Sequence, residues 1–219
     1  MTDRPPPHNR SAGVPSQSME DPAQPAAEFT TSPPHLPLSR VRSTLLVASY
    51  KMVKTIGREE DYLRALPLEH RATITGAVAG TWLEIAPAMA HYRACDSLGL
   101  TPDAQVDIGR TVGAQIRGTL FGTIVNLSKE AGVTPWAVLP AVPRWWPRVF
   151  EGSYISIWKL GPKDSRLDVS GLPFVDVPYF FNALRGQIMG MLDLFCTRTY
   201  VNARGHFGPG AASMRIQWA

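Results

Sequence analysis

A histidine and a cysteine with metal-binding chemistry, His91 and Cys95, stand four positions apart in a helical pattern. This spacing places both on one helix face, and imidazole and thiolate groups are common zinc ligands. Asp96 points to another face, however, and no third ligand follows locally. We therefore predict a buried thiol beside a hydrogen-bonded histidine and no metal site. The pair stays a candidate for the wall of a ligand cavity.

The sequence carries no signature of a catalytic site. It contains neither a GxSxG nucleophile elbow nor a cysteine in a catalytic motif. Glu84, Asp107 and Asp193 have no recognisable carboxylate partner for acid–base chemistry. An enzyme would need a site assembled from distant residues. That alternative stays open, and no cofactor is predicted.

Four glycines interrupt one long helix predicted over residues 101–130, namely Gly109, Gly113, Gly118 and Gly122. Each costs about 1 kcal/mol relative to alanine in a helix, so another group is expected to approach the backbone closely. At 100° per residue, Gly109 and Gly113 fall on the apolar stripe, whereas Gly118 and Gly122 fall almost opposite it. We predict that the first pair serves the core and the second faces a neighbouring element or a ligand.

A further pair, Gly186 and Gly190, lies off the core stripe of a later helix that begins near Pro178. We predict that this pair is the partner surface of Gly118 and Gly122, or the other wall of a ligand pocket. A phosphate-binding loop is excluded, because no GxGxxG or GxxxxGK[ST] motif follows a strand.

Trp145 and Trp146 lie between two arginines and two prolines in the segment PRWWPR, residues 143–148. Aromatic rings beside arginines can stack on bases, but no basic stripe extends the segment, so no nucleic-acid partner is expected. Two other roles stay open. Either both rings fill the seam between helices and sheet, or one is exposed and anchors a protein partner.

Hydrophobic periodicity predicts an α+β fold. Helical spacing runs, with breaks, from Ser39 to Phe150, and residues 153–170 then alternate as a β-hairpin. A helix from Pro178 and two alternating runs over residues 198–204 and 213–218 follow. The expected order is a helical part followed by a β-β-α-β-β unit with an antiparallel sheet. The core stripe of the late helix contains Phe180, Leu184, Ile188, Met191 and Phe195.

Residues 1–40 differ from the rest in composition, with nine prolines and almost no large apolar side chains. Such a segment cannot bury enough surface to offset its ordering entropy. We predict a disordered proline-rich arm over residues 1–40 that the fold does not need. Residues 41–219 are expected to form one α+β domain of ligand-binding type.

Charge and cysteine content bear on location. The formal net charge is +4, without basic runs, and the two cysteines, Cys95 and Cys196, stand outside any CxxC motif. Free thiols in a reducing compartment are therefore expected. No secretory signal pattern is present, and only eleven uncharged residues separate Arg117 from Lys129 in the long helix. We predict a cytoplasmic protein without a membrane span.

Several blocks of the sequence resemble a Myxococcales-restricted family of proteins of about this size. They are WLEIAPAMAHYRACDSLGLTPDAQVDIG, FEGSYISIWKLGPKDSRLDVSGLPF, PYFFNALRGQIMG and MRIQW, within residues 41–218. That family is distantly similar to the ligand-binding superfamily that joins haem nitric-oxide sensors, 4-vinyl-reductase domains and Bet3-type trafficking subunits. The resemblance implies a ligand-binding fold and does not by itself imply a function.

Together these observations favour a non-catalytic regulatory or sensory module that binds a small apolar ligand or a protein partner. An enzyme with a site assembled from distant residues and a homodimeric interaction scaffold are the alternatives. An enclosed apolar cavity would favour the module, and convergent titratable groups would favour the enzyme. A large exposed apolar patch would favour the scaffold.

The resemblance raises the question of haem, and the residues argue against it. Haem sensors of this superfamily use an axial histidine on the helix before the first hairpin and a Tyr-x-Ser-x-Arg motif in that hairpin. The corresponding predicted helix, Pro135–Phe150, contains no histidine. The sequence YVNAR, residues 200–204, imitates the motif but falls in the third predicted strand, so we interpret it as an ordinary strand face.

We accordingly predict that the purified protein does not bind haem. Titration of the protein with haemin, followed by absorption spectroscopy, should give no sharp Soret band at one equivalent. A stoichiometric band that disappears in a His91→Ala variant would contradict this prediction.

Overall fold

Most of the helices come before the long strands along the chain. The computed structural model describes residues 29–30, 37–128 and 134–219, with side chains for all of these except residues 30 and 116–128. The α-helices are α1 (Ser43–Thr55), α2 (Glu59–Ala65), α3 (Leu68–Thr75), α4 (Ile85–Asp96), α5 (Pro102–Ser128), α6 (Val142–Trp145) and α7 (Pro178–Leu192). The short 3-10 turns are η1 (Pro135–Ala137), η2 (Leu139–Ala141), η3 (Trp146–Arg148) and η4 (Pro173–Asp176). The strands are β1 (Phe29–Thr30), β2 (Arg40–Arg42), β3 (Trp82–Glu84), β4 (Phe150–Glu151), β5 (Tyr154–Gly161), β6 (Asp164–Ser170), β7 (Thr199–Gly208) and β8 (Ala211–Trp218).

A five-stranded antiparallel sheet has the order β1-β5-β6-β8-β7. In its central hairpin, Ile155 lies opposite Val169 and Ile157 opposite Leu167, and all four side chains are buried. Alternation along the strands thus places one apolar face against the helices and leaves the other face to polar residues. The pairing of β7 with β8 is irregular near Gly205 and again near Gly208. The prediction of an α+β fold, with a helical part before a β-β-α-β-β unit, is confirmed.

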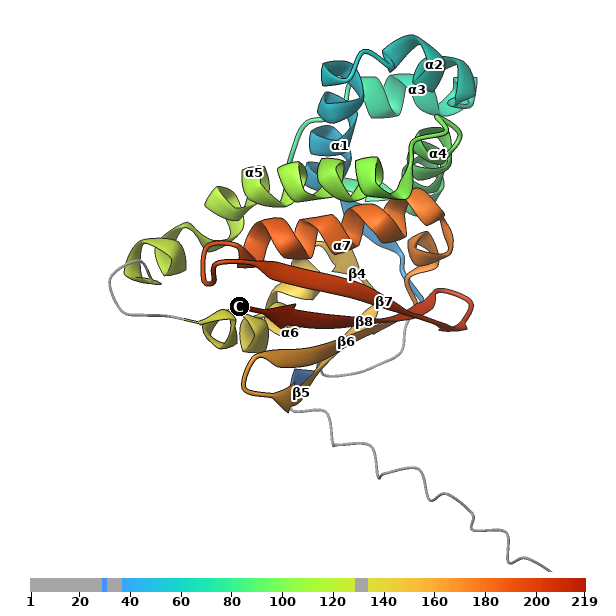
Figure 1. Cartoon of the computed structure of the whole chain (residues 1–219). Coiled ribbons are helices and arrows are strands. Elements are labelled where there is room, and N and C mark those ends of the chain that lie inside the picture. Colours follow the sequence, from blue (N-terminus) through green and yellow to red (C-terminus); the bar gives the residue numbers. More distant parts are fainter. Residues whose placement is uncertain (1–28, 31–36, 129–133) are drawn as a thin grey trace, which may run out of the picture.

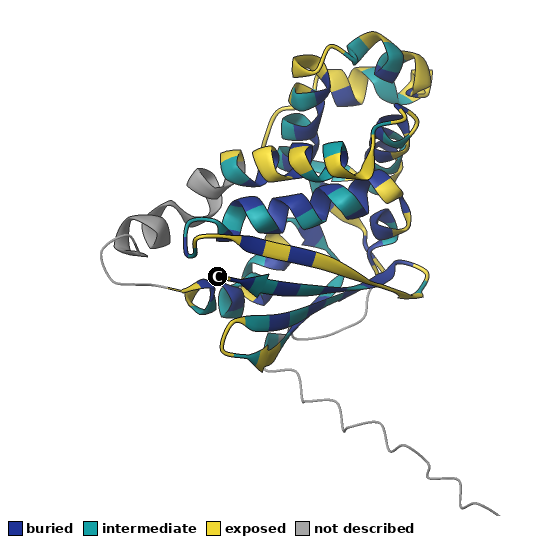
Figure 2. Cartoon of the chain, viewed as in Figure 1, coloured by how far each residue is buried: buried dark blue, intermediate teal, exposed yellow. Residues whose placement is uncertain are grey.

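Helix α7 lies between the sheet and α5 (Figure 1). Its sequence predicts a single apolar stripe, yet ten of its fifteen residues are buried, because other elements cover it on two sides. Figure 2 shows the contrast with α5, whose outer turns are exposed. The main hydrophobic cluster runs from Leu38 to Trp218 and includes much of α7, so α7 is the centre of the core.

Direct backbone contact between α5 and α7 explains four of the glycines. Gly109 and Gly113 face the backbone of α7, and Gly186 and Gly190 face the backbone of α5. A Cβ atom at any of these positions would lie far inside van der Waals contact with a carbonyl oxygen of the other helix. The neighbours advance together along both helices, so α5 and α7 run parallel. Glycine is required here because the helices touch through their backbones.

The partner of Gly186 and Gly190 therefore differs from the predicted one. They pack against the first half of α5, whose apolar stripe is the face that meets α7. The surroundings of Gly118 and Gly122 lie outside the described side chains, so the close approach expected there stays a prediction.

A second sheet, with the order β3-β2-β4, was not predicted. Residues 40–42 were expected in or beside a helix, and residues 82–84 at the start of one. Each of these strands has only two or three residues, which is too short for an alternating pattern to appear in the sequence. The small sheet joins the beginning of the chain's helical part to the segment before the large sheet.

Three residues assigned to the arm by composition belong to the folded part. Phe29 pairs with Ile157 at the edge of β5, Leu38 is 3% exposed, and Arg40 pairs with Glu84 in the small sheet. Edge pairing needs only backbone groups, so a segment poor in apolar residues can still add a strand. These positions therefore pair with or pack against the folded part, and the expectation that the fold does not need residues 1–40 stays a prediction. The rest of residues 1–36 lies outside the described chain.

Replacing Gly109 or Gly186 by alanine should destabilise the fold by about 2 kcal/mol or more, because the new Cβ meets rigid backbone and forces the helices apart. Helix propensity alone would give the opposite sign, a gain of up to about 1 kcal/mol. Chemical denaturation measures the free energy of unfolding.

The control is Gly208→Ala, since a Cβ at Gly208 meets nothing within 4 Å and its φ is not positive. It should change the free energy of unfolding by less than about 0.5 kcal/mol. The helix contact would be refuted by alanine variants at Gly109 and Gly186 that are as stable as the unsubstituted protein.

Candidate functional site

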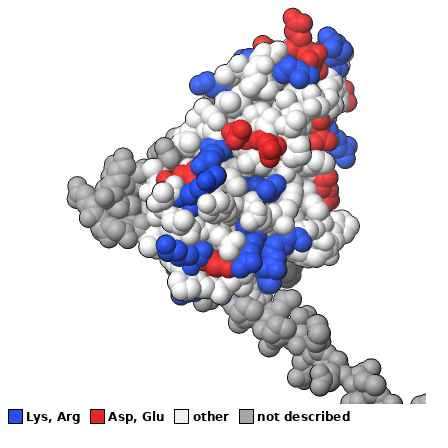
Figure 3. Space-filling view, viewed as in Figure 1, with Lys and Arg blue, Asp and Glu red and all other residues white. Residues whose placement is uncertain are grey.

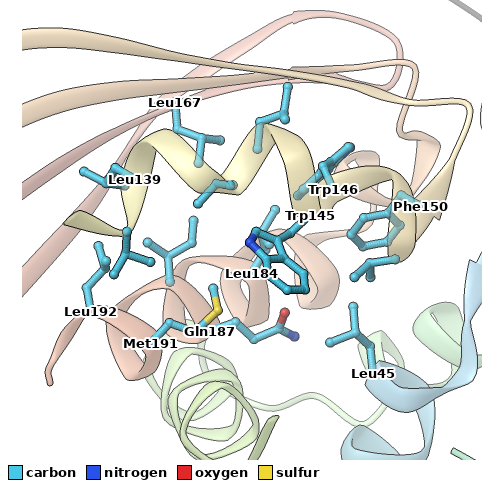
Figure 4. A pocket seen from close by; sticks show the side chains of 15 residues that line it. Leu45, Leu139, Trp145, Trp146, Phe150, Leu167, Leu184, Gln187, Met191 and Leu192 are labelled. Atoms are coloured by element: carbon cyan, nitrogen blue, oxygen red, sulfur yellow. The ribbon is translucent and has the colours of Figure 1, made fainter. Parts of the chain in front are cut away.

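An apolar cavity of about 90 Å³ lies between α7, the large sheet and the segment from η1 to η3 (Figure 4). The lining residues are Leu45, Val138, Leu139, Val142, Trp145, Trp146, Val149, Phe150, Ile155, Leu167, Leu184, Gln187, Ile188, Met191 and Leu192. Apart from Gln187 and the two indoles, every lining side chain is a hydrocarbon or a thioether. Such a wall favours an apolar occupant.

The segment over residues 135–150 forms one wall as a chain of short turns, where the sequence predicted a single helix. A proline occupies the first or second position of η1, η2, α6 and η3. Proline lacks an N–H group and clashes with the preceding turn, so each of these prolines ends the turn before it. The resulting arch presents Val138, Leu139 and Trp146 to the interior, where all three are buried.

Helix α7 and α1 supply the opposite wall. Leu184, Ile188 and Met191 of α7 line the cavity, and all three belong to the core stripe identified in the sequence. Leu45 of α1 closes one end (Figure 4). Because α7 also contacts α5 through its glycines, the position of this wall depends on the helix pair.

Trp145 and Trp146 both line this cavity. Trp146 is 8% exposed, its Nε1 donates to Ser153 Oγ at 2.7 Å, and its ring centroid lies 4.6 Å from that of Phe150. Trp145 is half-buried, with the Arg148 guanidinium 4.3 Å from its ring centroid. Of the two roles considered, these contacts match the filling of the seam between helices and sheet.

The cavity does not fit haem. None of the described lining residues is a histidine, cysteine or tyrosine, which are the usual proximal ligands of haem iron. Methionine lines the cavity, but it binds haem iron together with a histidine. Its volume of about 90 Å³ is also well below the 300–1,000 Å³ of typical pockets for drug-sized ligands. The residues of the imitated motif, Tyr200, Asn202 and Arg204, lie exposed on β7.

His91 and Cys95 lie in a buried polar cluster of the helical part, and neither lines the cavity. His91 Nδ1 lies 2.7 Å from the Tyr62 hydroxyl, and its Nε2 lies 3.0 Å from Ser49 Oγ. Ser49 Oγ lies 3.0 Å from the Tyr179 hydroxyl, and Cys95 Sγ lies 3.8 Å from His91 Nε2. Both imidazole nitrogens are engaged, and the hydrogen bonds join α1, α2, α4 and α7.

Burial sets the protonation of this cluster. It lowers the pKa of His91 to about 3 and raises the pKa of the Cys95 thiol to about 12. At neutral pH the imidazole is uncharged and the thiol keeps its proton, so Cys95 is a weak nucleophile and a weak metal ligand. The cluster therefore acts as a structural link between helices.

The described residues offer no other obvious chemistry. Among them, no three His, Cys, Asp or Glu side chains lie close enough to share a metal ion. Asp193 pairs with Arg110 at 2.6 Å and so links the end of α7 to α5, and Asp96 accepts a hydrogen bond from the Tyr179 N–H at 2.8 Å. The described part of the cavity wall contains no acid or base. The arrangement can enclose an apolar molecule but does not supply acid–base groups to it.

Sequence reasoning missed Gln187, the one amide among the described residues of the cavity wall. It lies three residues after Leu184 and four before Met191, on the apolar side of α7. A polar residue inside an apolar stripe was the available signal. Gly186 and Gly190, which were proposed as a pocket wall, are not among the lining residues.

The surface does not concentrate positive charge on the face shown in Figure 3, where acidic side chains lie among the basic ones. On the polar face of the sheet, Arg166 pairs with Asp168 at 3.1 Å and Arg215 pairs with Asp164. Among the helices of the described chain, none combines the length and the apolar character needed to cross a bilayer.

No protein-family model and no curated protein matches the sequence. Solved structures of H-NOX proteins are similar in fold. An H-NOX protein from K. algicida matches with a TM-score of 0.57 and 9% identity over 81% of this chain and 96% of its own. A mutant H-NOX protein from S. oneidensis matches with a TM-score of 0.59 and 10% identity over 81% and 96%. At these identities the likeness shows a shared fold.

A trafficking protein particle complex subunit 3 from Naegleria fowleri, covalently bound to palmitic acid, matches with a TM-score of 0.44. Its identity to this chain is 13%, over 81% of this chain and 95% of its own. This likeness is too weak to support an argument about the fold.

The His91 cluster predicts a specific pH dependence of stability. Below pH 6.5 the unfolded chain binds a proton at His91, whereas the folded chain does not until about pH 3. The free energy of unfolding should therefore fall by about 1.4 kcal/mol per pH unit as the pH drops below 6.5. A His91→Gln variant should lose this part of the slope. Denaturation of both proteins between pH 7 and 4.5 measures the difference, and identical slopes would contradict the assignment.

Proposed function

We propose that this protein is a non-catalytic sensory or regulatory module that binds a small apolar ligand in the cavity between α7 and the η1–η3 segment. The observation that carries the proposal is the cavity itself, whose wall is almost entirely hydrocarbon. Binding there would bury apolar surface of the ligand, which is the dominant favourable term for such molecules.

The position of the cavity supports a regulatory role. One wall belongs to α7, which is also in backbone contact with α5, and the other is an arch of short turns, each with a proline at its first or second position. An occupant would therefore contact a long helix and a segment of short turns. A ligand that prefers one arrangement of the arch would shift the population toward it.

The fold comparisons support the same class of function. H-NOX proteins, one of which was solved in work on haem distortion, share the architecture of this chain. The cavity described here lacks a haem ligand and the space for a porphyrin, so the proposal keeps ligand binding and leaves out the haem. We place the protein in the cytoplasm on the sequence argument given above.

The alternatives have less support among the described residues. An enzyme would need titratable groups around the cavity, and none lines it. For an interaction scaffold, the exposed large apolar side chains come from α3, β5, β7 and loops, and include Leu68, Tyr200 and Phe207. Binding of a protein partner through Trp145 and Trp146 stays a prediction, since both also line the cavity.

A substitution that fills the cavity tests the proposal. Met191→Trp should weaken binding of isobutane, a small apolar probe, by about tenfold or more, because the indole takes up the space. Met189→Trp is the matched control, since Met189 is a half-buried methionine on the same helix that is not among the described lining residues. Isobutane binding is followed by NMR titration, and native mass spectrometry of freshly purified protein detects a retained ligand. Equal binding by all three proteins would refute the proposal.

A further inference from the structure

Gln187 is a polar side chain buried in an apolar wall. It is 6% exposed, and it lines the cavity. In Figure 4 its amide end points toward the space between Trp145 and Leu45. No hydrogen bond joins this amide to another described residue, and its polar atoms border the cavity and are not sealed within the packing as the unpaired Tyr92 hydroxyl is.

Gln105, the other buried glutamine of the described helices, shows how such a residue is normally accommodated. It is 5% exposed, its Nε2 donates to the Leu100 carbonyl at 3.2 Å, and its Oε1 accepts from Asn182 Nδ2 at 2.8 Å. The two glutamines are almost equally buried, but only Gln105 forms side-chain hydrogen bonds with other described residues. The contrast assigns Gln187 a role other than packing.

A buried amide without a partner is less favourable than a hydrocarbon side chain of the same size. The neighbouring positions of the wall are occupied by leucine, isoleucine and methionine, so a hydrocarbon would be accommodated at position 187. The amide becomes favourable when a molecule in the cavity supplies the missing hydrogen bond.

We propose that Gln187 determines the specificity of the cavity, and that the ligand is a compact, uncharged molecule with an apolar body and one hydroxyl or carbonyl group. This inference rests on the function proposed above. The ligand's polar group lies against the Gln187 amide, and its apolar body lies against the leucine, valine and indole side chains.

The chemistry of the wall sets these limits. No described lining side chain is charged, and moving an ion into such a wall would cost more than one amide hydrogen bond returns. A glutamine amide both donates and accepts, so it serves a hydroxyl or a carbonyl equally. The cavity, at about 90 Å³, is smaller than an apolar cavity of about 150 Å³ that accepts benzene, which limits the ligand to a short chain of a few carbon atoms.

Propan-2-ol and isobutane test this inference, because they have similar size and differ in one hydroxyl group that replaces a methyl group. NMR titrations follow the indole N–H signals of Trp145 and Trp146 in the unsubstituted protein, in Gln187→Leu and in Gln105→Leu. Gln187→Leu should weaken propan-2-ol binding by about 3- to 10-fold, the worth of one hydrogen bond, and should leave isobutane binding equal or tighter. Gln105→Leu should leave the ratio of the two affinities unchanged.

Thermal denaturation without ligand gives an independent readout. Gln187→Leu should keep or raise the melting temperature, because it removes an unpaired buried amide, whereas Gln105→Leu should lower it. A lowered melting temperature for Gln187→Leu would show that the amide is satisfied within the protein, and would overturn the inference.

The two proposals fail in different ways. If propan-2-ol and isobutane both bind and Gln187→Leu leaves their ratio unchanged, the cavity binds ligands and the role of Gln187 is refuted. If neither compound binds the unsubstituted protein, the proposed ligand-binding function fails, and the specificity inference fails with it.

Discussion

The contact between the backbones of α5 and α7 is the constraint on which the rest of the structure depends. Four glycines let the helices approach until a single added carbon on either one would strike a carbonyl oxygen of the other. This contact fixes α7 between the helical part and the sheet, so that its remaining faces carry the core on one side and the cavity wall on the other. The ion pair of Arg110 with Asp193 fastens the same two helices near the end of α7.

The contacts on the two sides of this helix pair differ in kind. In the helical part, His91 and its hydroxyl partners form a buried polar cluster. Its hydrogen bonds form only when the four helices that it joins keep their relative positions. Around the cavity, the contacts are almost all apolar, and they tolerate changes of side-chain shape more easily. The two sides of the helix pair are therefore held together by different kinds of contact.

Much of the fold follows from sequence periodicity, because the long elements repeat their pattern several times. The hairpin of β5 and β6 and the stripe of α7 were identified with their buried residues. The short strands of the small sheet carry too few residues to show a period, and the prolines between residues 135 and 147 act one turn at a time, which a search for one helix overlooks. The site was harder to predict. Which helix Gly186 faces, and what surrounds Gln187, are set by tertiary packing.

The edges of the large sheet have a consequence for the behaviour of the protein at high concentration. A free sheet edge can recruit the same edge of another molecule and start aggregation. Here β1 covers part of the β5 edge with two residues of the chain's own beginning. At the other edge, the pairing of β7 with β8 is irregular near Gly205 and Gly208. Such irregularities increase the twist of an edge strand, so that a strand of another molecule pairs with it less readily. The two-residue strand β1 and the irregular pairing of β7 thus help to keep separate copies of the sheet apart.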